Sequence, residues 1–201
     1  MTCGIRCTAG SPYLKSRRKR CFDIVVCLVL LPPVMVLLGV VALVTLVGQG
    51  RPLLFVQTRV GKNGMLFRMP KFRTLRGAAP RGPLAADVAA YATPAGRWLR
   101  RHKLDELPQW FTVLAGRMSL VGPRPELPDI VATYSAFQRK RLLMKPGLTG
   151  LWQVMANHKT PIHQHLKYDL YYLRKADFRL DVKLLVLTLA LVLRPPGRYH
   201  S

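Results

Sequence analysis

Acidic residues are scarce in this sequence. It has 9 Asp and Glu against 32 Lys and Arg, which gives a formal net charge of +23 over 201 residues. A chain so short of acids attracts polyanions: nucleic acid, anionic lipid headgroups or phosphate-rich substrates. The length is sufficient for one domain with a real core and argues against two.

Cysteine and histidine are also sparse, and their positions argue against a structural metal site. The four cysteines are confined to the first 27 residues: Cys3, Cys7, Cys21 and Cys27. The first two have metal-like spacing but no histidine nearby, because the first histidine is His102. The other two lie in an apolar run and are predicted to be small apolar residues. Nothing in this usage requires an oxidising compartment.

Charge is absent from residues 21–47 except at Asp23. This run exceeds the roughly 20 residues that a helix needs to cross a bilayer, and no cleavage pattern of a signal peptide follows it. Basic residues flank it on both sides, so the positive-inside rule favours the cytoplasmic face for both flanks. Pro32-Pro33, near the middle, would break the helix. The pattern predicts a re-entrant membrane anchor over residues 19–49; a kinked helix that crosses the bilayer is the alternative.

The anchor divides the chain into three parts. A flexible basic tail is predicted over residues 1–18, and a cytoplasmic domain over residues 50–201. In that domain a β-hairpin is predicted over 52–75, turning at Asn63-Gly64, with Pro70 placing the return strand at an edge. Residues 77–96 are rich in Ala, Gly and Pro and predict a loop, with a short helix over 84–91.

The remaining sequence favours helices, which makes the fold class α+β and mostly helical. One helix is predicted to begin at Asp105 as its N-cap and to end at Gly116. Others are predicted over 128–144, from Thr160-Pro161 onward, and over 184–193 as a core or interfacial helix too short to span a membrane. A turn is predicted at 145–150. His163 and His165 would diverge on the helix opening at Thr160-Pro161, which argues against a metal site there.

Asp105 and Glu106 are the adjacent acids of the chain. Neighbours on a helix point about 100° apart, so the two are expected to divide labour: one attacks or abstracts, and the other holds a metal. The positive end of a helix lowers the pKa of a carboxylate and attracts phosphate. Four basic residues that closely precede the pair would add to this effect: Arg97, Arg100, Arg101 and Lys103. This setting suits phosphoryl transfer. The alternative is a capping Asp followed by an ordinary Glu.

Two further cationic features could meet phosphate. Arg124 lies between Pro123 and Pro125, whose fixed φ angles limit the freedom lost on binding, and its guanidinium suits a diphosphate. A structural arginine in a tight turn is the alternative. Lys71 and Arg73, at the end of the predicted hairpin, could contact lipid headgroups or substrate phosphate.

Several long motifs occur together. They read Lys-Phe-Arg-Thr-Leu (71–75), Leu-Asp-Glu-Leu-Pro-Gln (104–109), Met-Ser-Leu-Val-Gly-Pro-Arg-Pro (118–125), Lys-Pro-Gly-Leu-Thr-Gly-Leu-Trp-Gln-Val (145–154) and Asp-Leu-Tyr-Tyr (169–172). In this order the chain resembles, over residues 19–193, the bacterial sugar transferase family, the monotopic polyprenyl-phosphate phosphoglycosyl transferases.

The resemblance implies an enzyme of the bacterial inner membrane, with a re-entrant anchor, interfacial amphipathic helices and a catalytic domain on the cytoplasmic face. Asp105 would attack the β-phosphate of a nucleoside-diphosphate sugar, expected to be a UDP-hexose, and form a phosphosugar-aspartate. Polyprenyl phosphate would then take the phosphosugar. Glu106 corresponds to a glutamate associated with Mg²⁺. Cationic and acidic positions of the family fall on residues expected to bind substrate: Lys71, Arg73, Arg100, Arg124 and Asp169.

The chain departs from the family pattern at three positions. Pro32-Pro33 stands where the family has Ser-Pro, Lys103 replaces a Ser or Thr, and Asn157 stands where an Arg is expected. The last change bears on sugar selection or a phosphate contact. Two other readings remain: a non-enzymatic basic protein of the membrane surface, and a nucleic-acid-binding protein. The second ranks last, because half of the chain is apolar and no groove-reading module is present.

Overall fold

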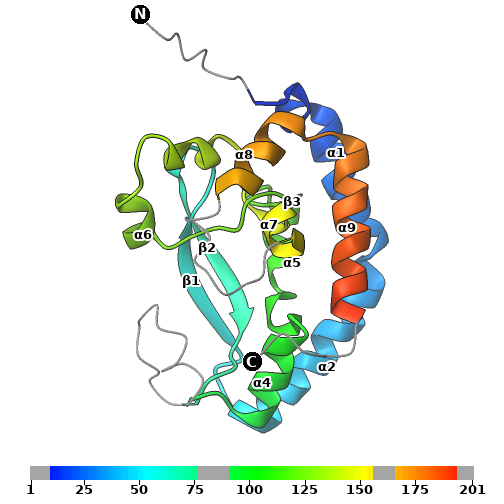
Figure 1. The fold of residues 1–201 in the computed structure, drawn as a ribbon. Coiled ribbons are helices and arrows are strands. Elements are labelled where there is room, and N and C mark those ends of the chain that lie inside the picture. The colour runs from blue at the N-terminus through cyan, green and yellow to red at the C-terminus, as the bar shows by residue number, and fades with distance from the viewer. Residues whose placement is uncertain (1–9, 77–90, 156–165, 194–201) are drawn as a thin grey trace, which may run out of the picture.

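The computed structural model describes residues 10–76, 91–155 and 166–193, and its fold is mostly helical with two small sheets. Helices α1 (Arg17–Val29), α2 (Leu31–Gln49) and α9 (Phe178–Leu193) form one side of the molecule (Figure 1). The hairpin of β1 (Leu54–Val60) and β2 (Leu66–Phe72) lies on the other side, and the shorter elements fill the space between. The predicted α+β, mostly helical class is confirmed.

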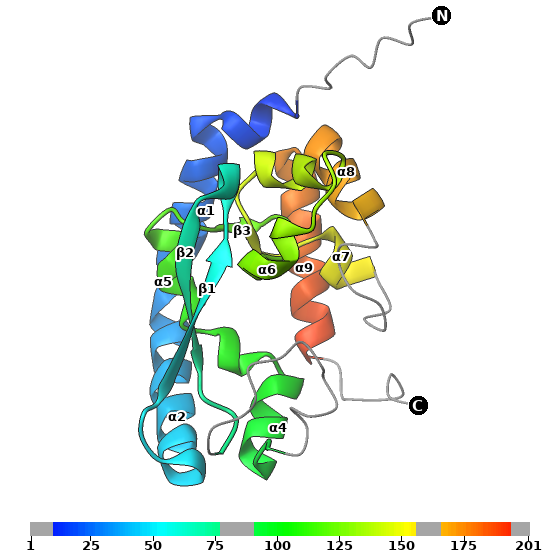
Figure 2. The ribbon, with the colours of Figure 1, turned by 90° about the vertical axis from the view of Figure 1, so that its left-hand side faces the viewer.

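The apolar run of the sequence forms α1 and α2, which lie end to end (Figures 1 and 2). They meet at Leu30, and the prolines stand in the first turn of α2, where a missing N–H removes no helical hydrogen bond. The break predicted at Pro32-Pro33 is therefore confirmed. In the described part of the chain, α2 is the helix long and apolar enough to span a membrane, with 17% of it buried inside the protein. The re-entrant path remains a prediction.

The N-terminal segment is held from Ser11 onward. The Ser11 N–H donates to the carbonyl of Leu173 at 2.7 Å, and the Ser11 hydroxyl donates to the carbonyl of Ala176 at 2.6 Å. A 3₁₀ turn, η1 (Pro12–Lys15), then leads into α1. The flexible tail predicted over residues 1–18 is wrong for this part, because these hydrogen bonds hold the chain on α8 (Leu166–Lys175) and its C-terminal end.

Helix α9 is tied to α1 by a buried ion cluster. The Lys19 ammonium lies 3.0 Å from the Asp23 carboxylate and 2.6 Å from that of Asp181. Leu184 of α9 is buried in the main core, whereas Leu189 and Leu193 are exposed. Helix α9 thus combines a core face with exposed apolar residues, and it begins six residues before the predicted start because Phe178 and Asp181 belong to it.

The hairpin has the predicted strands and turn. β1 and β2 are antiparallel, with Leu54 opposite Phe72 and Val60 opposite Leu66. The turn passes through η2 (Lys62–Gly64), where Asn63 and Gly64 take φ values of 56° and 79°. Asparagine and glycine tolerate this left-handed region best. Pro70 lies in β2 at a sheet edge, as predicted, since both strands of a two-stranded sheet are edges.

Helix α4 (Pro94–Arg101) follows the segment predicted as a loop. The Thr93 side chain caps it, accepting from the Gly96 N–H at 2.8 Å. The loop prediction is thus wrong from Pro94 onward. Gly96 permits close packing on the end of the hairpin, because a Cβ there would lie 2.1 Å from the Thr74 carbonyl oxygen. Residues 84–90 of the short helix predicted before it lie outside the described residues.

The helix predicted to begin at Asp105 is divided. A 3₁₀ turn, η3 (Leu104–Glu106), precedes α5 (Gln109–Leu114), so Asp105 is not an α-helical N-cap. Pro108, which has no backbone N–H, lies at the start of α5. The predicted end is confirmed, since Gly116 has φ 77°. The Trp110 indole N–H donates to the Cys27 carbonyl at 3.1 Å, which fixes α5 against α1.

A small parallel sheet replaces the turn predicted at 145–150. β3 (Ser119–Val121) pairs with β4 (Gly147–Thr149), and α7 (Leu151–Met155) follows. The approach requires glycine, because a Cβ at Gly147 would lie 2.1 Å from the Gly122 nitrogen. The helix predicted over 128–144 is also wrong: it is divided into α6 (Pro128–Ala132) and the 3₁₀ segment η4 (Gln138–Leu143). The start of the helix predicted from Thr160-Pro161 lies outside the described residues.

Candidate active site

A pocket of about 260 Å³ opens where the hairpin, α4, η3, the loop after β3 and α7 meet. Four cationic side chains and two carboxylates line it, together with one indole and one amide. These residues are Lys71, Arg100, Lys103, Asp105, Glu106, Arg124, Trp152 and Gln153. The cations outnumber the acids by two, so the pocket suits an anionic ligand.

A tight backbone turn places the two acids at this pocket. Helix α4 ends at Arg101, and Lys103 then adopts φ 56° and ψ 20° in the left-handed region. This conformation is uncommon for a residue other than glycine, and such strain is concentrated at functional sites. The turn leads directly into η3, in which Asp105 is 7% exposed.

Glu106 is held by two cations. The Lys71 ammonium lies 2.9 Å from Glu106 Oε1, while Arg124 Nη2 lies 2.7 Å from Oε1 and Arg124 Nη1 3.3 Å from Oε2. Burial opposes ionisation of Glu106, but the charges of Arg124 and Lys71 hold its pKa below the usual range. Glu106 is therefore a permanent carboxylate that orients both cations.

Asp105 has a different environment. No hydrogen bond or ion pair to its carboxylate occurs within residues 10–76, 91–155 and 166–193. Burial and the charge of Glu106 raise the pKa of Asp105 to about 6, against the opposing effect of Lys71, Arg100 and Arg124. The pKa lowering expected from a helix N-terminus is thus wrong: desolvation dominates, and the α-helix starts only at Gln109.

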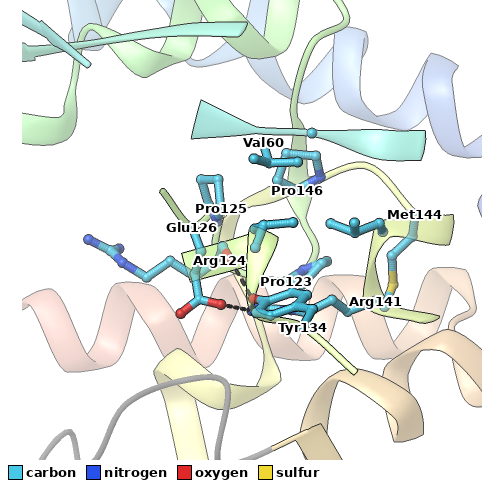
Figure 3. Close-up of a pocket in the computed structure, with 12 residues that line it drawn as sticks. Val60, Pro123, Arg124, Pro125, Glu126, Tyr134, Arg141, Met144 and Pro146 are labelled. Carbon is cyan, nitrogen blue, oxygen red and sulfur yellow. Dashed lines mark hydrogen bonds and ion pairs between the residues drawn. The ribbon is translucent and has the colours of Figure 1, made fainter. Parts of the chain in front are cut away.

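Arg141 holds the backbone of Arg124 in place. One guanidinium nitrogen of Arg141, Nη2, donates to the Arg124 carbonyl at 2.9 Å, and Nη1 donates to the Glu126 carboxylate and to the Tyr134 hydroxyl. Figure 3 shows Arg141 and Tyr134 against Glu126, whereas the Arg124 side chain extends away from them. Arg141 is 2% exposed. The loop around Arg124 therefore rests on a buried ion cluster that directs its guanidinium toward Glu106.

Asp169 belongs to this supporting cluster. Its carboxylate lies 2.9 Å from Arg141 Nε, and burial raises its pKa to about 6 while Arg141 opposes the shift. Asp169 does not line the pocket. Through its contact with Arg141, Asp169 helps to position Arg124. The sequence did not indicate this role.

The structure brings together most of the predicted site. Lys71, Arg100 and Arg124 line the pocket with the two acids, whereas Arg73 does not. The Arg73 guanidinium donates instead to the carbonyls of Leu75 and Arg51, at 3.0 Å each. The sequence interpretation named Lys103 among the basic residues that precede the acids, and it missed three residues with a place in or behind the site: Arg141, Trp152 and Gln153. Trp152 and Gln153 stand inside a recognised motif, but nothing distinguishes Arg141 among 32 basic residues.

Gln153 is conspicuous among the residues that line the pocket. It is 4% exposed, and neither its amide nitrogen nor its amide oxygen has a hydrogen-bond partner in the described part of the chain. A buried polar group without a partner costs about 1–3 kcal/mol. Such groups in native proteins call for an explanation, such as a ligand.

The acids of the pocket are compatible with Mg²⁺. No group of three or more His, Cys, Asp or Glu side chains that could hold a metal occurs among the described residues. Mg²⁺ does not require one, because it commonly binds through one or two carboxylates together with substrate phosphates and water. A carboxylate offers about four acceptor positions, and the contacts from Lys71 and Arg124 occupy three at Glu106. One position therefore remains there, and the Asp105 carboxylate stands beside it.

Comparison with known proteins agrees with this site. The model of the bacterial sugar transferase family matches residues 14–195. Galactosyl transferase CpsE of Streptococcus agalactiae is 37% identical over 164 residues, which cover 74% of this chain and 36% of CpsE. The uncharacterized sugar transferase EpsL of Bacillus subtilis is 36% identical over 180 residues, which cover 89% of each chain.

A third relative is the undecaprenyl-phosphate galactose phosphotransferase of Salmonella typhimurium. It is 35% identical over 201 aligned residues, which cover 90% of this chain and 41% of the relative. This chain thus spans less than half the length of CpsE and of the Salmonella protein, but most of EpsL. The assignment made from the motifs is confirmed: the chain belongs to the bacterial sugar transferase family.

Proposed function

We propose that this chain transfers a sugar-1-phosphate from a nucleoside-diphosphate sugar, expected to be a UDP-hexose, to polyprenyl phosphate, with release of UMP. The reaction would begin the synthesis of a bacterial surface glycan. Relatives are named undecaprenyl-phosphate phosphotransferases of galactose, of glucose and of N-acetylgalactosamine. The observation that carries the proposal is the buried Asp105 carboxylate, which has no hydrogen bond or ion pair among the described residues and lies beside Glu106, itself paired with Lys71 and Arg124.

The proposed reaction has two displacements at phosphorus. In the first, a carboxylate oxygen of Asp105 bonds to the β-phosphorus of the donor, the bond to the bridging oxygen breaks, and UMP leaves with that electron pair. In the second, a phosphate oxygen of the lipid bonds to the same phosphorus and the bond to Asp105 breaks. Asp105 is regenerated as a carboxylate, and the lipid carries the phosphosugar as a diphosphate.

The pocket charges support this assignment of roles. Lys71 and Arg124 together exceed the charge of Glu106 by one. Arg100 and Lys103 add two further positive charges, so the surplus can compensate Asp105 and part of an incoming diphosphate. The guanidinium of Arg124 is planar and suits bidentate contact with phosphate oxygens. These fixed cations would stabilise the charge that develops on the leaving phosphate.

We also propose that Mg²⁺ binds at Glu106 together with the phosphates of the donor. The ion would supply charge neutralisation for the diphosphate and the leaving group. The chain's own contribution is to keep Glu106 ionised and oriented through Arg124 and Lys71, whose ion pairs lower its pKa.

The lipid acceptor implies a membrane setting for the site. Helix α2 would anchor the chain in the cytoplasmic membrane, and a re-entrant path would keep the pocket on the cytoplasmic face, where nucleotide-sugars are made. Anionic lipids would contact the basic flanks. Cysteine labelling at Lys15 and Lys62, in a chain with its native cysteines replaced by serine, tests this path. Modification of both positions from the cytoplasmic side supports it, and modification from opposite sides contradicts it.

The function is tested with the chain in vesicles that contain undecaprenyl phosphate and Mg²⁺. UDP-glucose, UDP-galactose and UDP-N-acetylgalactosamine are offered, and release of UMP and formation of the lipid-linked sugar are measured. We expect both products from at least one donor, and neither from Asp105→Asn. Salt-sensitive vesicle binding without nucleotide release from any donor would instead support a non-enzymatic membrane-surface protein.

A further inference from the structure

Helix α7 forms the uncharged wall of the pocket. It contributes Trp152 and Gln153, an indole and a neutral amide. Lys71, Arg100, Lys103 and Arg124 provide the charge that phosphates need. The pocket therefore has a charged part for phosphates and a neutral part for another portion of the ligand.

Gln153 contributes the amide of this neutral part. Both of its amide atoms are buried and without a hydrogen-bond partner in the described residues. Gln109 provides an internal comparison: it is 3% exposed and its amide nitrogen also lacks a partner in the described part of the chain, but it does not line the pocket. Of these two glutamines, Gln153 alone borders the space that a substrate would enter.

The chemistry of the amide indicates its ligand. A phosphate oxygen accepts hydrogen bonds and could satisfy only the amide nitrogen of Gln153, whereas a hydroxyl both donates and accepts. In the proposed reaction the sugar is bonded directly to the phosphate that Asp105 attacks, so it must lie in the same pocket. The pocket volume of about 260 Å³ is below the roughly 300 Å³ at which pockets for drug-sized ligands begin, so it suits the sugar-phosphate portion of the donor.

We propose that Gln153 is a sugar-binding residue whose side-chain amide hydrogen-bonds a hydroxyl of the donor's sugar. This inference rests on the proposed function, because it places the transferred sugar beside Asp105. The hydroxyl would supply the partners that the amide lacks among the described residues. Gln153 would thus help to orient the sugar while the four cations hold its phosphate.

The test uses the full chain in vesicles with undecaprenyl phosphate and the UDP-hexose that it turns over fastest. The donor is compared with analogues in which each sugar hydroxyl in turn is replaced by hydrogen. For the unmodified chain we expect one deoxy donor to lose roughly tenfold in kcat/KM, the effect of one lost hydrogen bond. If every deoxy donor stays within about twofold of the parent, the proposal is overturned, whatever the behaviour of any variant.

Gln153→Met then identifies the residue that binds this hydroxyl, since methionine keeps the length but removes the amide. We expect a roughly tenfold lower kcat/KM for the parent donor and no further loss for the sensitive deoxy donor. Gln109→Met is the matched control and should keep the discrimination seen in the unmodified chain. The proposal is overturned if Gln153→Met still discriminates between the parent donor and the deoxy donor as the unmodified chain does. It is also overturned if the variant changes only the preference between UDP and dTDP donors.

The two proposals fail in different ways. If the unmodified chain releases no UMP from any donor, the proposed function fails. If it turns over the donor and Gln153→Met retains the full hydroxyl dependence, only the assignment of Gln153 fails.

Discussion

Two ion clusters lie on either side of the loop around Arg124, and they differ in burial, in charge and in completeness. The pocket cluster, defined by the four cations and two acids that line the pocket, has a surplus of positive charge. In the part of the chain that the structure describes, it leaves the Asp105 carboxylate without a hydrogen bond or ion pair. The support cluster, defined by Arg141, Glu126, Asp169 and Tyr134, has one cation for two acids, and Arg141 bonds to all three other members.

This difference separates a binding site from a structural one. The buried ion cluster that links α1 to α9 has the same pattern as the support cluster, with Lys19 contacting both Asp23 and Asp181. Both of these clusters give every charged side chain an ion-pair partner within the cluster. The pocket cluster does not, because the charge that completes it is expected to come from the substrate's phosphates.

The largest expected effect comes from removing the Asp105 carboxylate from the pocket cluster. Asp105→Asn keeps the shape but removes the nucleophile, and we expect kcat/KM to fall by about 10⁴-fold or more. UMP release measures this. Asp129→Asn makes the same change at an exposed acid and should leave activity within about twofold. Substantial turnover by Asp105→Asn would remove the distinction between the two clusters.

Breaking the support cluster should primarily affect stability. Arg141→Met removes the cation that pairs with the buried carboxylates of Glu126 and Asp169, which we expect to destabilise the fold by about 3–5 kcal/mol. Thermal unfolding in detergent measures the loss. Arg139→Met, at an exposed arginine, should stay within about 0.5 kcal/mol of the unmodified chain. An unchanged melting temperature for Arg141→Met would show that the cluster does not hold the loop.

Arg124 connects the clusters, and its geometry should matter as well as its charge. Arg124→Lys keeps the charge but loses the two-pronged contact with Glu106, so we expect a loss of about 10- to 100-fold in kcat/KM. Arg117→Lys, at an exposed arginine, is the matched control. Equal activity of both variants would indicate that a simple positive charge at residue 124 is sufficient.

The smallest expected effect is a dependence on pH. With a pKa of about 6, Asp105 is protonated in acid and cannot attack, so kcat/KM should fall about tenfold per pH unit below 6. Because Lys71 lowers this pKa, Lys71→Met should move the acid limb to higher pH. Rates measured with saturating lipid acceptor test this. A profile that remains flat to pH 5 would contradict the desolvated environment of Asp105.

The sequence predicted much of the site because its motifs are local. Asn63-Gly64 specified the hairpin turn, and that hairpin places Lys71 at the pocket. The Asp105-Glu106 pair and the Arg124 loop were recognised from neighbouring residues. Pro32-Pro33 likewise predicted the break between α1 and α2.

Contacts between distant segments could not be predicted in this way. The pairing of β3 with β4 depends on the close approach of Gly122 and Gly147, which no local pattern indicates. The pKa of Asp105 depends on burial by other elements, so the expected helix-dipole effect had the wrong sign. The role of Arg141 depends on partners 15 and 17 residues earlier, at Glu126 and Arg124.

The central claim is that Asp105 becomes covalently bonded to the phosphosugar. The most direct measurement is mass spectrometry of the chain mixed with its UDP-sugar and Mg²⁺ in the absence of lipid acceptor, followed by peptide mapping. We predict an added sugar-phosphate on the peptide that contains Asp105, lost when undecaprenyl phosphate is added and absent from Asp105→Asn. Turnover of donor to lipid product without such an adduct, or an adduct on another residue, would contradict the mechanism.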